Sequence, residues 1–182
     1  VSQPSQGVQV TTWAAMGIDG TKGNGVAYTS GSISGTADGE AFTYTVTATP
    51  SGSHKLNVKG ANEGTGHLGD GGTFNAGNGV NLSVLVTSGN VQFDGFTRFS
   101  LSNTTSTEGA TVNGNAYTPG TNGIGAAAYF NLTGAPVTSF AHTSTGTTNI
   151  GWVDAQFSAV PEPTSAALLG IGGLTLILRR RK

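Results

Sequence analysis

Alternating and β-branched stretches recur along the first 160 residues and predict a mainly β protein. The segment 41–49, AFTYTVTAT, is the clearest, because its larger apolar residues fall on one face of a strand and its threonines on the other. Comparable patterns predict further strands at 8–15, 26–34, 54–60, 80–89, 91–103, 126–134, 137–144 and 150–160. About eight or nine strands of this kind favour an antiparallel β-sandwich or jelly roll.

Two segments between these strands, 61–79 and 103–123, are rich in Gly, Asn and Thr and are predicted as loops. Both exceed the usual length of a connection in a compact domain. Loops of that length either form a binding surface or lack fixed structure, and the sequence leaves both alternatives open.

The composition narrows the class of protein further. Charged residues make up only 9% of the 182 residues, there are 30 glycines, and cysteine is absent. Residues 1–160 carry four basic and eight acidic residues, which leaves a net charge of −4. A body without a basic cluster is not expected to bind nucleic acid, because that binding depends on neutralising phosphates. The absence of cysteine excludes disulfides and thiolate metal sites.

The last 23 residues differ from the rest of the chain. VPEP at 160–163 predicts a stiff, extended hinge after a secreted domain at 1–159. Residues 164–178 carry no charge and predict a short hydrophobic helix of roughly 22 Å, shorter than the roughly 30 Å hydrocarbon core of a bilayer. Residues 179–182, which include Arg179, Arg180 and Arg181, form a basic stop expected to stay cytoplasmic. The layout predicts a processed sorting signal, with a permanent membrane anchor as the alternative.

This order of VPEP, apolar run and RRRK resembles the PEP-CTERM sorting domain of Gram-negative bacteria. The resemblance implies recognition by exosortase, a membrane protein with a Cys/Arg/His active site, at the motif Pro161, Glu162 and Pro163. It also implies transient residence in the inner membrane, cleavage near the motif, and delivery to the cell surface or extracellular matrix. It covers only residues 160–182 and says nothing about the body.

Few residues of the body suggest a binding site. Asp19, Asp38 and Asp70 each precede a glycine and are weak candidates for a structural calcium ion, although Asp-Gly is above all a turn dipeptide. Trp152, in the last predicted strand, is a candidate platform for stacking on a sugar ring, although a tryptophan in a strand more often lies in the core. Trp13 and the tyrosines carry the same two alternatives.

Catalysis is not indicated. The histidines, His54, His67 and His142, show no metal-binding spacing and are expected at the surface. No nucleophile elbow is present, and the scattered acids signal no paired-carboxylate site, so we predict neither an enzyme nor a bound cofactor.

These patterns together predict an exported structural or adhesive protein of the cell surface or of an exopolysaccharide (biofilm) matrix. One alternative is a lectin-like module that binds carbohydrate, in which Trp152 would be exposed. Another is a matrix subunit that self-associates through an open sheet edge.

Overall fold

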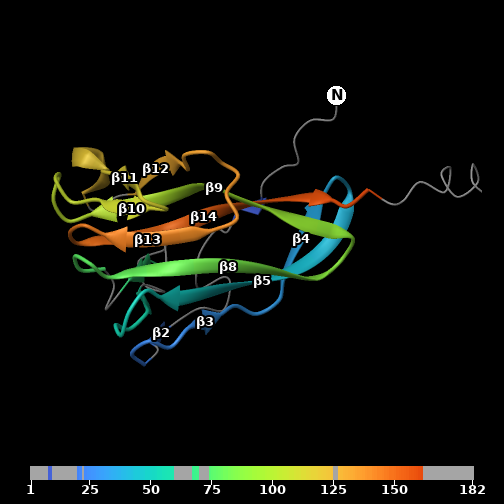
Figure 1. Ribbon diagram of the computed structural model, residues 1–182, viewed down its shortest axis with the longest axis horizontal. Coiled ribbons are helices and arrows are strands. Elements are labelled where there is room, and N and C mark those ends of the chain that lie inside the picture. Colours follow the sequence, from blue (N-terminus) through green and yellow to red (C-terminus); the bar gives the residue numbers. More distant parts are fainter. Residues whose placement is uncertain are drawn as a thin grey trace, which may run out of the picture.

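Two antiparallel β-sheets account for nearly all the regular structure of the protein (Figure 1). The structure is a computed structural model that describes residues 8–9, 20–21, 23–59, 67–69, 74–124 and 127–161. Every pairing between its strands is antiparallel, and its one helical segment is a short 3₁₀ turn, Gly120–Gly123. The chain is thus mainly β, as its alternating pattern predicts.

Each sheet has seven strands among the described residues. The first sheet runs in the order β12 (Ala128–Asn131), β9 (Val91–Asn103), β14 (Thr148–Ala159), β7 (His67–Gly69), β6 (Asn57–Lys59) and β2 (Gly20–Thr21), and β1 (Val8–Gln9) also pairs with β14. The second sheet runs in the order β11 (Asn115–Tyr117), β10 (Ala110–Val112), β13 (Phe140–Ser144), β8 (Gly79–Ser88), β5 (Glu40–Pro50) and β3 (Tyr28–Thr29), and β4 (Ile33–Ala37) also pairs with β5.

The longest strands lie where the sequence predicts them. β5 covers the alternating segment 41–49, β9 coincides with 91–103, and β14 covers 150–159 of the last predicted strand. The predicted strand at 26–34 is divided between β3 and β4, because both pair with the same side of β5 at different points along it. The total of fourteen described strands exceeds the predicted eight or nine because several pairings involve only two or three residues.

Aromatic side chains fill the space between the two sheets. Phe157 of β14 contacts Phe42 and Tyr44 of β5, with ring centroids 4.6 and 4.8 Å apart. Phe140 of β13 packs edge-on against Phe99 of β9 at 5.6 Å. A fully buried Phe side chain contributes roughly 2 to 3 kcal/mol. These contacts bring the two apolar faces together without any disulfide, since the chain has no cysteine.

The segment 103–123, predicted as a long loop, contains two short strands, β10 and β11, so the prediction of a loop is wrong there. β10 and β11 form a hairpin whose turn, Asn113–Gly114, has φ angles of 51° and 81°, the left-handed values that Asn and Gly adopt most readily. Asn113 Nδ2 donates to the Ser139 carbonyl, and its Oδ1 accepts from the Ala141 amide, which ties the hairpin to the neighbouring strand. The alternating pattern does not reveal this hairpin, because its strands have only three residues each.

The approach to this hairpin is held by side chains as well. Buried Asn103 donates to the carbonyls of Glu108 and Gly120, at 3.0 and 3.4 Å. The Glu108 carboxylate accepts hydrogen bonds from the Thr104 hydroxyl and from the Thr104 and Thr105 amides. The bond from the Thr104 hydroxyl is the main reason why the pKa of Glu108 falls to about 2. The Glu108 carboxylate therefore keeps its charge in mild acid, and the turn that it holds keeps its geometry.

β14 ends beside the turn that joins β4 to β5 (Figure 1). Pro161 is the last described residue, so Glu162, Pro163, the predicted helix at 164–178 and the basic residues 179–182 lie outside the described part. Among the residues that are described, no helix has the length and apolar content needed to span a membrane.

Candidate functional site

A β-bulge in β14 places Trp152 on the outer face of the first sheet. Ile150 pairs with Leu101 and Val153 pairs with Phe99, so Gly151 and Trp152 together stand opposite the single residue Ser100. In a regular strand Trp152 would share the inward face with Ile150. The extra residue moves Val153 to that inward position and turns Trp152 outward. The Trp152 amide, released from the ladder, donates to the Ser100 hydroxyl at 2.8 Å.

Trp152 does not stand alone on this face. Its ring stacks on Tyr129 of β12, with centroids 5.1 Å apart and planes inclined by 30°. Tyr129 lies directly across from Ser100 in the β12–β9 pairing, and this small, fully buried serine separates the two aromatic positions. Tyr129 is 65% exposed, whereas Trp152 is only partly exposed. The stacked pair, Tyr129 and Trp152, is called the aromatic platform below.

An ion pair borders the aromatic platform. Arg98 of β9 lies opposite Asp154 of β14, and its Nε and Nη2 lie 2.7 and 2.6 Å from Asp154 Oδ2. The same guanidinium carbon lies 5.7 Å from the centroid of the Trp152 ring. The Asp154 side chain is only 7% exposed, while that of Arg98 is 52% exposed. The buried carboxylate therefore holds an exposed guanidinium in one orientation beside the platform.

The arrangement suits recognition of a flat molecule that has both an apolar face and polar edges. Tyr129 offers an exposed ring face, and Trp152 fixes that ring from behind. Arg98 and Asn131, which pair across β9 and β12 and are both exposed, supply hydrogen-bonding groups at the margin. A sugar ring has this combination of apolar C–H face and equatorial hydroxyls.

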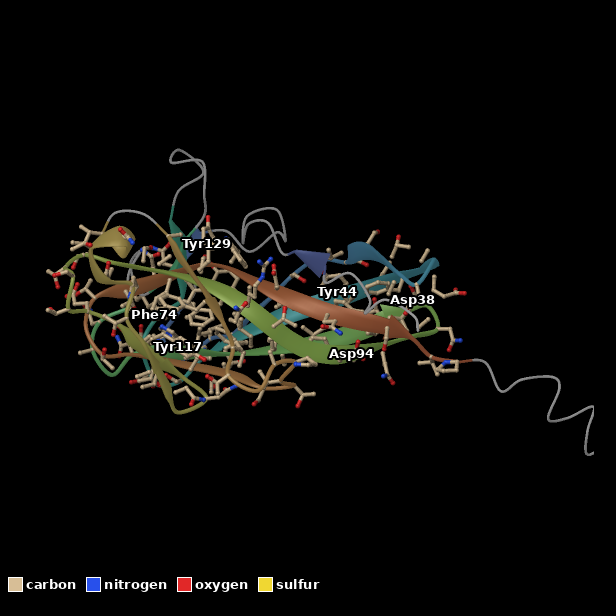
Figure 2. All side chains as sticks on the ribbon, turned by 90° about the horizontal axis from the view of Figure 1, so that it is seen from above. Asp38, Tyr44, Phe74, Asp94, Tyr117 and Tyr129 are labelled. Carbon is tan, nitrogen blue, oxygen red and sulfur yellow. The ribbon has the colours of Figure 1, made fainter. Side chains whose placement is uncertain are left out.

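Figure 2 shows Tyr129 near the upper margin of the body, apart from Phe74 and Tyr117, which are buried. Trp152 is the residue that sequence reasoning selected, but the more exposed partner is Tyr129. Arg98 had no distinguishing signal in the sequence, because its partners lie on two other strands, β12 and β14. Only the pairing of β12, β9 and β14 brings these residues together.

Only one of the three predicted calcium ligands, Asp38, lies in the described part of the chain. Asp38 lies in the β4–β5 turn with φ of 52°, and its Oδ2 accepts from the Ala159 amide at 3.2 Å. Asp19 and Asp70 lie outside the described residues, as does Trp13. No group of three His, Asp or Glu suited to a metal ion occurs in the described part.

One histidine departs from its expected surface position. His142 faces the core between Phe140 and Ser144, is fully buried, and packs on Phe74 with ring centroids 5.0 Å apart. Neither ring nitrogen has a hydrogen-bond partner within the described structure. Burial lowers the pKa of His142 to about 3, so the ring stays neutral. The sequence pattern of β13 does not show which of its two faces is buried, so the burial of His142 was not predicted.

Comparison with known proteins concerns the end of the chain. Residues 159–182 match the PEP-CTERM protein-sorting motif. This confirms the resemblance noted in the sequence, and it implies an extracellular protein that is sorted and processed by exosortase and exported across the membrane to the cell surface. No curated protein and no solved structure matches the chain.

Proposed function

We propose that the body is a non-catalytic β-sandwich that attaches to neutral polysaccharide at the cell surface or in the extracellular matrix of a Gram-negative bacterium. The sorting tail delivers it there after a transient stay in the inner membrane. The aromatic platform of Tyr129 and Trp152 is the observation that carries the proposal. The structural or adhesive role predicted from the sequence and the lectin-like alternative then describe one activity, which is adhesion through carbohydrate binding.

The exposure of Tyr129 supports binding rather than a purely structural role. An aromatic side chain that is 65% exposed on an edge strand adds little to the core, yet its ring is held in place by Trp152. Rigid aromatic rings bind with little loss of conformational entropy, because their orientation is settled before the ligand arrives. The anchored guanidinium of Arg98 is preorganised in the same way by Asp154.

The charge balance favours a neutral ligand. The Arg98–Asp154 pair has no net charge, and residues 1–160 carry a net charge of −4. An anionic polysaccharide would be repelled by this body at long range. A neutral glycan meets no such barrier and can use the stacking face and the polar margin together.

The proposal is tested by affinity electrophoresis of the purified protein in gels that contain a neutral β-glucan, with alginate as the acidic comparison. We expect the neutral glucan to retard the parent. Tyr129→Ala should weaken binding about tenfold, which corresponds to about 1.4 kcal/mol of lost contact. Tyr129→Phe should bind nearly as well as the parent, because the stacking face remains.

Leu85→Ala is the matched control, since Leu85 is 66% exposed and lies on β8 in the other sheet. It removes exposed apolar surface away from the aromatic platform and should leave binding unchanged. If folded Tyr129→Ala were retarded by every glycan as strongly as the parent, the aromatic platform would not be the binding site. Retardation by alginate alone would refute the neutral ligand.

A second candidate is self-association through β4. Among the described residues this strand pairs only with β5, and it contains no charged residue or proline, the features that usually block an open sheet edge. Thr36 is exposed on it, so Thr36→Lys should reduce association if copies pair there. Light scattering decides: a parent that stays monomeric at high concentration contradicts this candidate.

A further inference from the structure

The end of β14 is fastened to two turns just before the residues Pro161, Glu162 and Pro163. Asn90, in the turn between β8 and β9, makes two contacts with Val160: its carbonyl accepts from the Val160 amide, and its Nδ2 donates to the Val160 carbonyl, both at 2.9 Å. Asp38, in the turn between β4 and β5, accepts from the amide of Ala159. These two residues are called the exit clamp below.

The exit clamp extends the order of the sheet beyond its last paired residue. The ladder between β14 and β9 ends at Ala159 opposite Val91, yet both polar backbone groups of Val160 are still bonded. Figure 2 shows Asp38 at the end of the body where β14 leaves it. The turns that hold the exit come from hairpin β4–β5 of the second sheet and from the connection between the sheets. The strand end is therefore secured by parts of the fold outside its own sheet.

A peptide bond within a paired strand is protected, because a protease needs several residues of extended, accessible chain and reaches them only after local unfolding. We propose that the exit clamp sets the limit of sorting-signal processing: the body is protected through Val160, and cleavage leaves a mature protein that ends at or beyond Pro161 with β14 intact. Asp38 and Asn90 are thus positioning residues for processing.

The spacing also defines a surface that the processing enzyme meets. Four residue steps separate Val160 from Thr164, the start of the uncharged run, and they span at most about 14 Å when extended. An enzyme that cuts in this interval must therefore come within about 14 Å of Val160, which the turns at Asp38 and Asn90 hold in place. The inference concerns processing and does not depend on glycan binding.

The test is the intact mass of the mature protein, produced from the full chain in cells that carry the processing enzyme. The parent should end at or beyond Pro161. Asp38→Gly keeps the left-handed turn but removes the acceptor, and Asn90→Ala removes the Nδ2 donor. Each lost bond should raise the open population of the strand end roughly fivefold, and the two together roughly 25-fold. The double variant should therefore yield additional products that end between Phe157 and Val160.

Two matched variants separate the exit clamp from general effects of substitution. Asp38→Asn keeps both an acceptor oxygen and the preference for positive φ, so it should give the parental end. Asn81→Ala makes the same change of side chain as Asn90→Ala at an exposed position of β8 and should also give the parental end. A parent that ends at or before Val160, or a double variant with the parental end, would overturn the proposal.

Limited digestion of the purified full chain with proteinase K gives an independent reading that needs no processing enzyme. Cuts between Phe157 and Val160 should appear much earlier in the double variant than in the parent. Equal cutting rates at these bonds in both proteins would show that the exit clamp protects nothing. Circular dichroism of each variant confirms that the sheets remain folded, so that early cutting is assigned to the exit.

Discussion

Lowering the pH from 7.5 to 5 is expected to destabilise the folded protein through His142. The pKa of this buried histidine is about 3 in the folded state, against an ordinary value of 6.5. The unfolded chain therefore binds the proton first, and stability falls as the pH drops from 6.5 toward 3. At pH 5 the folded ring is still neutral, so the loss depends on the unfolded chain alone. It amounts to about 2 kcal/mol at pH 5 and about 3 kcal/mol at pH 4.

Urea unfolding of the full chain, followed by circular dichroism at several pH values, measures this loss. His142→Leu removes the titrating ring, and its difference in unfolding free energy from the parent isolates the histidine. That difference should change by about 2 kcal/mol between pH 7.5 and 5 in favour of the leucine variant. His142→Met offers a more flexible side chain for the same space beside Phe74. If both folded variants lost stability in acid as steeply as the parent, the loss could not come from protonation of His142 in the unfolded chain, and the argument would be refuted.

Three further comparisons test the packing. Tyr44→Phe should raise the free energy of unfolding by about 1 kcal/mol, because the buried Tyr44 hydroxyl has no hydrogen-bond partner in the described structure. Burial also raises the pKa of Tyr44 to about 12. Unchanged or lower stability in urea would contradict this expectation. Asn113→Ala should cost about 1 kcal/mol more than Asn113→Gly, since both lose the side-chain bonds but only alanine resists the left-handed turn; equal thermal midpoints would refute the argument. Gly79→Ala should prevent folding or greatly destabilise the protein, because the added Cβ would overlap the His142 carbonyl. Gly31→Ala is the control: Gly31 has open space around it, so this variant should unfold at the same temperature as the parent.

The β content was predictable because strand alternation is a local property. The pattern of 41–49 alone indicates which residues of β5 face inward, and Phe42 and Tyr44 are indeed buried. The hairpin of β10 and β11 was not predictable in the same way. Its three-residue strands are too short to show a period, and they are stabilised by contacts that Asn113 makes with residues about 26 to 28 positions away.

The candidate site, like the fold, was predictable from the sequence only in part. A tryptophan in the last strand could be recognised, but its side could not, because one bulged residue reverses the face on which Trp152 lies. Tyr129 and Arg98 carry no mark in the sequence that relates them to Trp152. They meet only because β12 and β14 pair with opposite sides of β9.

The sequence alone identifies the destination of this protein, because the sorting motif is a continuous stretch, 159–182, that can be recognised as a linear pattern. It also determined the β class, through a period of two residues within each strand. The tertiary structure alone decided the aromatic platform, the neutral buried His142 and the exit clamp at Asp38 and Asn90. Each of these three features depends on strand register and on contacts between residues distant in the chain. No local pattern of amino acids predicts such register or contacts.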